Sequence, residues 1–143
     1  MDHDSYSAAY IRGILESVKA IALVGASANP DRASHHVMEF LLHQGYEVYP
    51  INPGLAGKTL LGRMVYASLA DVPKAIDMVD VFRNSEAAGE TVDEALALSP
   101  LPKAIWLQLG VRNDAAAARA EAHGVAMVMN RCPAIEMPRL GMV

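Results

Sequence analysis

The sequence predicts a single Rossmann-like α/β domain: a doubly wound parallel sheet of about five strands with helices on both faces. Five short apolar runs alternate with segments whose apolar residues recur at helical spacing. Such alternation with short connections favours right-handed βαβ units and a parallel sheet. The length of 143 residues is that of one domain, and a composition of 52% hydrophobic and 20% charged residues allows a buried core.

The five apolar runs are near-continuous rather than alternating, which is typical of strands covered on both faces. They are Ala20–Val24, Tyr46–Ile51, Ile76–Phe82, Ala104–Leu109 and Val125–Met129. Pro50 lies within the second run, and because proline is poor in a central strand, we interpret it as marking that strand's end. The segment Gly57–Val65 has no clear period and is interpreted as a loop with a short extended piece.

The segments between these runs predict helices. An amphipathic leading helix is expected at Tyr6–Val18, and a second at Ser34–Gln44, with Gly45 at its C-terminal cap. Ser85 is expected to cap a third helix. Asn113 and Asp114 open an alanine-rich fourth helix that stops at Gly124, and Pro133 is placed to open a short fifth.

Composition and charge exclude several classes of protein. With 12 basic and 16 acidic residues, the net charge of −4 gives no electrostatic footprint for nucleic acid. The single cysteine, Cys132, can form neither an intramolecular disulfide nor a cysteine-based zinc site. The polar N-terminus is unlike a signal peptide, and no apolar stretch is long enough to span a bilayer. We therefore expect a cytoplasmic protein without a membrane partner.

A ligand is expected at the carboxyl ends of the strands, near the switch in strand order. The loop after the first strand begins with Gly25, Ala26 and Ser27, where a phosphate can approach the main chain. Arg32 adds a cation, and the helix that begins near Ser34 adds free N–H donors. The alternative is an ordinary tight turn in which Ser27 or Ser34 caps the helix. The loop matches neither the GxGxxG fingerprint nor a Walker P-loop.

The end of the second strand argues against NAD. An enzyme that prefers NAD usually places an acid there to hold the ribose hydroxyls, whereas this chain has Asn52 and Pro53. Lys58 and Arg63 follow and face either a sugar phosphate or solvent.

The titratable residues indicate no catalytic group. His35 and His36 follow the phosphate loop in the first helical turn and are interpreted as partly exposed. His3, His43 and His123 are interpreted as surface residues, and no histidine spacing suggests a metal site. The aspartates Asp77 and Asp80 have opposite strand parity and so do not share a face.

Taken in order, the residues that follow the strands resemble a known family. The pieces are Val24-Gly25-Ala26-Ser27 with Asn29-Pro30 and Arg32; Gly45-Tyr46 and Asn52-Pro53; Tyr66 and Ser68-Leu69 before Val72-Pro73; Asp80-Val81-Phe82-Arg83; Trp106-Leu107-Gln108 with Gly110; and Arg131-Cys132 with Glu136 and Arg139-Leu140. From Ile21 to Leu140 the chain resembles the small stand-alone CoA-binding proteins, whose domain is similar to the N-terminal domain of the succinyl-CoA synthetase α subunit.

This resemblance implies coenzyme A as the ligand. It implies that Gly25, Ala26 and Ser27 lie against the pyrophosphate, with Arg32 nearby and Ser34 at the helix start. It implies that Asn52, Pro53 and Lys58 lie near the adenosine and its 3′-phosphate, and that Phe82 and Arg83 lie beside the nucleotide or the start of the pantetheine arm. It places Gly110 after the fourth strand, and Asn130, Cys132 and Pro133 towards the thiol. Many members carry an acid where this chain has Asn130, so the resemblance does not imply an acid–base role there.

The resemblance does not extend to the synthetase's other parts, because the second α-subunit domain, with its phosphorylated histidine, is absent from this sequence. We therefore expect a non-catalytic carrier, sensor or regulatory module for CoA or acyl-CoA. The alternatives are a component of a CoA-ligase or transferase-like enzyme that needs a partner chain and, more weakly, an NAD(P)-dependent oxidoreductase. A homodimer and an unidentified protein partner both stay open. Cys132 is interpreted as a packing residue, the alternative being a mixed disulfide with the CoA thiol.

Overall fold

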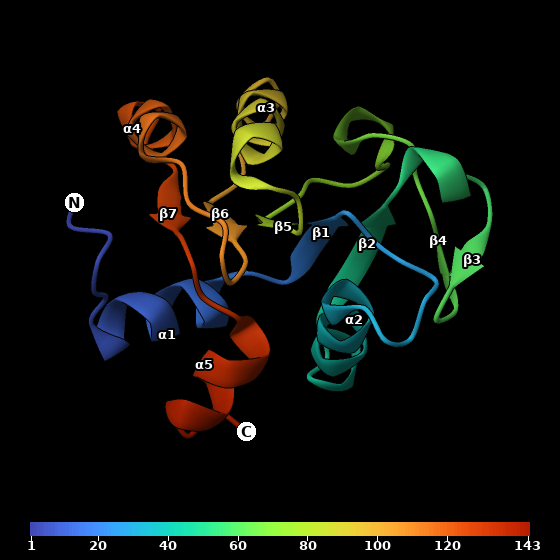
Figure 1. Ribbon diagram of the computed structural model, residues 1–143, viewed down its shortest axis with the longest axis horizontal. Coiled ribbons are helices and arrows are strands. Elements are labelled where there is room, and N and C mark those ends of the chain that lie inside the picture. Colours follow the sequence, from blue (N-terminus) through green and yellow to red (C-terminus); the bar gives the residue numbers. More distant parts are fainter.

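A parallel sheet of five strands, in the order β2-β1-β5-β6-β7, forms the centre of the chain (Figure 1). The computed structural model describes residues 1–143. The strands of this sheet are β1 Ala20–Val24, β2 Glu47–Ile51, β5 Met78–Val81, β6 Ala104–Leu107 and β7 Ala126–Val128. The predicted Rossmann-like α/β fold is confirmed, and each strand lies within one of the predicted apolar runs.

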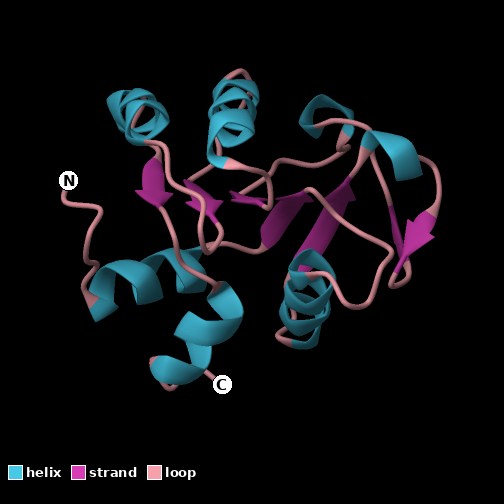
Figure 2. Cartoon of the chain, in the orientation of Figure 1, coloured by secondary structure: helices cyan, strands magenta, loops and turns pink.

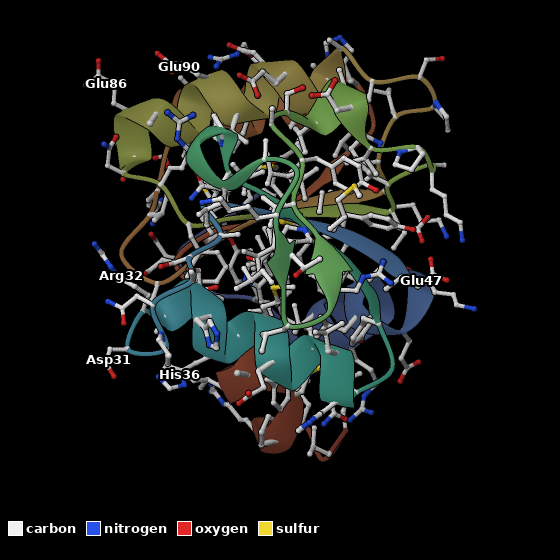
Figure 3. The ribbon with its side chains drawn as sticks, turned by 90° about the vertical axis from the view of Figure 1, so that its right-hand side faces the viewer. Asp31, Arg32, His36, Glu47, Glu86 and Glu90 are labelled. Carbon is white, nitrogen blue, oxygen red and sulfur yellow. The ribbon has the colours of Figure 1, made fainter.

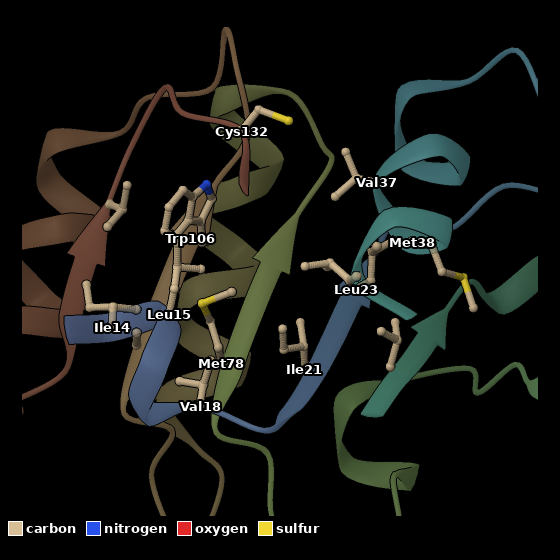
Figure 4. Close-up of a cluster of buried hydrophobic side chains, with 14 of the residues drawn as sticks. Ile14, Leu15, Val18, Ile21, Leu23, Val37, Met38, Met78, Trp106 and Cys132 are labelled. Atoms are coloured by element: carbon tan, nitrogen blue, oxygen red, sulfur yellow. The ribbon is translucent and has the colours of Figure 1, made fainter. Parts of the chain in front are cut away.

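Helices cover both faces of the sheet (Figures 1 and 2). On one face lie α1 Ala8–Ser17, α2 Ala33–His43 and α5 Pro133–Arg139, and on the other lie α3 Ser85–Leu96 and α4 Asp114–Ala122. Each face has its own cluster of buried apolar side chains, because successive strand residues point to opposite sides. Figure 4 shows the cluster beneath α1 and α2, in which Trp106 is completely buried.

Pro50 does not end the second strand, so that interpretation was wrong. β2 continues to Ile51 and lies at the edge of the sheet, where Pro50 pairs in register with Leu23 of β1. The carbonyl of Pro50 accepts a hydrogen bond from the N–H of Tyr66 on the outer side of the strand. In a strand, the nitrogen of a residue points to the same side as its carbonyl, so the nitrogen of Pro50 also points away from β1. The missing N–H of the proline therefore removes no hydrogen bond between β1 and β2.

Two local details also differ from the sequence predictions, and a third agrees with them. The segment Gly57–Val65 contains a small antiparallel hairpin, β3 Thr59–Leu60 and β4 Arg63–Met64, which packs beside the β2 edge. Asn84, rather than Ser85, caps α3, because its side-chain oxygen accepts from the N–H of Ala87 at 2.8 Å. The alanine-rich helix α4 is capped by Asn113 as expected.

The N-terminal segment is fastened along the outer edge of β7. The Tyr10 hydroxyl donates to the carbonyl of Met127 at 2.7 Å, and the Tyr6 hydroxyl accepts from the N–H of Met129 at 2.9 Å. His3 was expected at the surface but is only 8% exposed, because its ring is held by the Tyr6 hydroxyl at 2.7 Å and by Glu121 at 2.5 Å. None of the helices has the length and apolar character needed to cross a bilayer.

Candidate functional site

The largest cavity lies at the carboxyl edge of the sheet, where the strand order switches between β1 and β5. Its volume is about 520 Å³. It is lined by Gly25, Ala26, Ser27, Arg32, Ala33, Ser34, Asn52, Phe82, Arg83, Gln108, Leu109 and Val111. These residues follow β1, β2, β5 and β6 or begin α2. This is the place where a doubly wound sheet binds its ligands.

Gly25 allows the chain to leave β1 directly against β5. Its φ of +91° lies in the left-handed region, and a β-carbon there would stand 2.6 Å from the carbonyl oxygen of Phe82. The N–H groups of Gly25 and Ala26 both donate to the carbonyl of Ile51, at 3.1 and 3.2 Å. These two N–H groups are therefore already engaged, and a phosphate would have to be bound by donors further along the loop.

The loop between β1 and α2 is braced by its own side chains. The Ser27 hydroxyl accepts from the N–H of Asn29 at 3.1 Å, and the Asn29 side chain accepts from the N–H of Asp31 at 3.0 Å. No side chain caps α2, so the alternative in which Ser27 or Ser34 serves as its cap is wrong. The first turn of α2 is thus uncapped, and its residues line the cavity at the positive end of the helix dipole.

Asn52 holds the turn after β2 against the loop after β1. Its side-chain nitrogen donates to the carbonyl of Ala26, and its side-chain oxygen accepts from the N–H of Gly54, both at 2.8 Å. Because both polar ends of the Asn52 side chain are engaged, Asn52 shapes the cavity wall.

Two arginines give the cavity its positive charge. Arg32 is exposed and forms neither an ion pair nor a side-chain hydrogen bond; Figure 3 shows it at the edge of the molecule, on the side where α3 begins. Arg83 is partly buried, and its guanidinium donates to the Thr91 hydroxyl at 3.1 Å and lies 3.9 Å from Glu90. Arg32 is therefore the freer of the two to pair with a ligand phosphate.

A second cavity of about 420 Å³ adjoins the first and shares Gly25, Asn52 and Arg83 with it. Its other walls are Val24, Ile51, Pro53, Ala67, Ser68, Glu90 and Glu94. The two cavities together make a long cleft along the carboxyl edge of β2, β1, β5 and β6, which we call the edge cleft.

Five of the predicted binding residues line neither cavity: Lys58, Gly110, Asn130, Cys132 and Pro133. Lys58 is exposed in the turn that leads into β3. Asn130 has a φ of +57°, and its side-chain oxygen accepts from the N–H of Gly110 at 2.8 Å, which ties together the loops after β6 and β7. Cys132 is only 7% exposed and belongs to the core cluster near Trp106 (Figure 4).

Several residues of the cleft were not predicted as binding residues from the sequence, and Gln108 is one of them. It is only 6% exposed, and its side-chain oxygen has no hydrogen-bond partner although it lines the larger cavity. The signal was present, since Gln108 follows the fourth predicted strand directly at its carboxyl end. It is the only polar side chain among the cavity residues that follow β6.

The chain belongs to a family of CoA-binding domains, since the family model described as a CoA binding domain matches residues 19–138. The uncharacterized protein YneT of Bacillus subtilis is 36% identical over 126 residues, which are 88% of this chain and 90% of that protein. The α subunit of an ADP-forming acetate–CoA ligase I from Pyrococcus furiosus is 30% identical over 80 residues. These residues are 53% of this chain and only 17% of that subunit.

A solved structure has the same fold over almost the whole chain. A hypothetical protein from Pyrococcus horikoshii is 38% identical, with a TM-score of 0.89, covering 98% of this chain and 96% of its own. The fold is thus that of stand-alone proteins of similar length. The chain is a CoA-binding domain related to one region of a ligase α subunit.

Proposed function

We propose that this domain binds CoA or an acyl-CoA in the edge cleft and acts as a stand-alone carrier, sensor or regulatory module rather than as a catalyst. The observation that supports this best is the union of two adjoining cavities around Gly25, Asn52 and Arg83 at the switch in strand order. CoA is a long anionic molecule, and the cleft is long and has its cations near the middle. The family assignment favours the same ligand.

The pyrophosphate would lie at the start of α2. Arg32, whose guanidinium is unpaired, lines this part of the cavity together with Ala33 and Ser34 of the uncapped first turn of α2. The geometry supports Arg32 over Lys58 as the main phosphate partner, because only Arg32 lines a cavity. Asn52 and Pro53 would then form the wall beside the adenosine.

The structure gives little support to NAD as the ligand. The side chain that follows β2 is Asn52, and both of its polar ends are engaged within the protein. It has no free carboxylate with which to hold the two ribose hydroxyls.

A second candidate function is a subunit of an ADP-forming CoA ligase. The similarity to the α subunit of acetate–CoA ligase favours it, although the similar region spans only 17% of that subunit. This function requires a stable partner chain that supplies the remaining activity. It predicts co-purification of that chain and CoA-dependent acyl transfer in the reconstituted mixture, and a clean homodimer or monomer would exclude it.

Calorimetric titration of the protein, freed of endogenous ligand, tests the main proposal. CoA, acetyl-CoA, NAD and ATP are titrated in parallel. Saturable binding of the CoA species, with NAD and ATP at least tenfold weaker, is the expected result. Binding of NAD or ATP without any response to CoA would refute it.

A further inference from the structure

The unpartnered amide of Gln108 marks one end of the edge cleft. Its backbone N–H donates to the carbonyl of Val81 at 3.1 Å, and its carbonyl accepts from the N–H of Val111 at 2.9 Å. The side-chain oxygen of Gln108, in contrast, is buried and has no hydrogen-bond partner inside the protein. A buried amide that forms no hydrogen bond lowers stability, so its presence in a cavity wall indicates a partner that comes with the ligand.

The backbone fixes the direction of this side chain. Gln108 extends β6 by one residue beyond the register pair Val81 and Leu107, which sets it opposite Phe82. Strand alternation places Gln108 on the same face as Trp106, which is the face that α1, α2 and α5 cover. Gln108 and Phe82 are therefore neighbours on this face, and both residues line the larger cavity.

The chemical character of the cleft changes along the sheet. At the end near β2 and α3, the smaller cavity is lined by Ser68, Glu90 and Glu94, and the arginines lie near the middle. At the β6 end the walls are the apolar side chains of Leu109 and Val111, with Gln108 as the only polar group. That end suits an uncharged, largely apolar chain with few hydrogen-bonding groups.

We propose that the β6 end of the edge cleft receives the pantetheine arm and that Gln108 binds one of its secondary amides. This inference rests on the proposed function, because it assigns part of the same ligand. A secondary amide offers one N–H and one carbonyl, and the glutamine amide has a matching acceptor and donors. Gln108 would thus select for a ligand that carries the arm, while Arg32 binds the phosphates that other nucleotides share.

Two ligands and two matched variants test the assignment. CoA carries the arm, and adenosine 3′,5′-bisphosphate lacks it. Gln108→Met keeps the length of the side chain but removes its hydrogen bonds, and Gln108→Leu is the second variant in case methionine packs poorly. Gln44→Met is the control, because Gln44 lies at the opposite end of α2, outside both cavities.

We expect Gln108→Met to weaken CoA binding by about tenfold and to change binding of the bisphosphate by less than about twofold. We also expect the ligand-free variant to melt about 3 to 5 °C higher, because an unpaired buried amide has been removed. A residue that merely supports the fold would lower the melting temperature instead. Gln44→Met should leave both affinities unchanged.

The possible failures are distinguishable. If Gln108→Met lowers the affinity for CoA and for the bisphosphate equally, or leaves the affinity for CoA unchanged, the role of Gln108 is overturned and the proposed function is unaffected. Wild-type protein that binds CoA no more tightly than the bisphosphate would also overturn it, since the arm would then contribute nothing. A wild-type protein that does not bind CoA would overturn the proposed function together with this inference.

Discussion

Asp80, in the middle of β5, gives the sharpest test of how this core is built. Its side chain is 0% exposed, and neither carboxyl oxygen has a hydrogen-bond partner. Its register neighbours on the flanking strands are Leu23 and Trp106, which offer no charge. Burial therefore raises the pKa of Asp80 well above its ordinary value, and the neutral acid is the favoured form in the folded protein.

The sign of the pH dependence follows from this shift. In the unfolded chain an aspartate loses its proton near pH 4. Above that pH the folded protein holds one more proton than the unfolded chain, so the free energy of unfolding falls as the pH rises. The loss is about 1.4 kcal/mol per pH unit and continues until the pH reaches the pKa of folded Asp80. Below about pH 4 the penalty is absent.

The perturbation is Asp80→Asn, which keeps the shape of the side chain and does not titrate. Urea unfolding of wild type and variant is measured at each pH unit from 4 to 7. We expect the stability of the variant relative to wild type to increase from pH 4 upward, by up to about 1.4 kcal/mol per pH unit, until the pH reaches the pKa of folded Asp80. Any pH-independent cost of the buried asparagine amide cancels from this slope.

Asp77→Asn is the matched control, three residues away. Although burial raises the pKa of Asp77, hydrogen bonds from the N–H groups of Ala20 and Lys19 and the charge of Lys103 together bring it below its ordinary value. Its stabilisation is present above about pH 4 and is lost as the pH falls through the folded pKa. The control should therefore differ from wild type by a constant amount between pH 4 and 7. Parallel stability curves for wild type and Asp80→Asn would refute the reasoning.

Three further substitutions test the site and its supports. Arg32→Ala should weaken CoA binding by about fivefold to tenfold at low salt and by less at high salt, because an exposed ion pair is screened; calorimetry at two salt concentrations measures this. Gly25→Ala should destabilise the protein by more than about 2 kcal/mol in urea unfolding, because of the left-handed φ and the contact with Phe82; a neutral result would contradict the described turn. His3→Ala should lower the free energy of unfolding by about 1 to 2 kcal/mol and speed hydrogen exchange at the Met129 amide, because His3 holds the Tyr6 hydroxyl that binds this amide. Unchanged exchange would show that the N-terminal segment stays in place without His3.

The general fold and the place of the site were predictable from the sequence. Buried parallel strands are short, apolar and separated by helices, and all five strands of the main sheet show that pattern in the sequence. Once the strand order is doubly wound, the residues after β1, β2, β5 and β6 must meet at one edge. The sequence could therefore predict that Gly25, Arg32 and Phe82 lie together, and the larger cavity does bring them together.

The remaining details depend on partners that are distant in the sequence. The burial of His3 depends on Glu121, 118 residues away, and no local pattern announces such a contact. The N–H groups of Gly25 and Ala26 looked free because their acceptor, Ile51, belongs to another strand. Strands as short as β3 and β4 have no measurable period, so Gly57–Val65 could only be interpreted as a loop with a short extended piece.

Both margins of the central sheet are closed to a further strand. Along β2 the outward carbonyl groups of Val48 and Pro50 are taken by the Arg63 side chain and the Tyr66 N–H. Along β7 the tyrosine hydroxyls of the N-terminal segment occupy the backbone groups of Met127 and Met129. A second copy or an extended peptide cannot add to this sheet by backbone pairing without first displacing these groups. Any assembly that this protein forms must therefore join through its helices, its loops or the β3–β4 hairpin rather than through the central sheet.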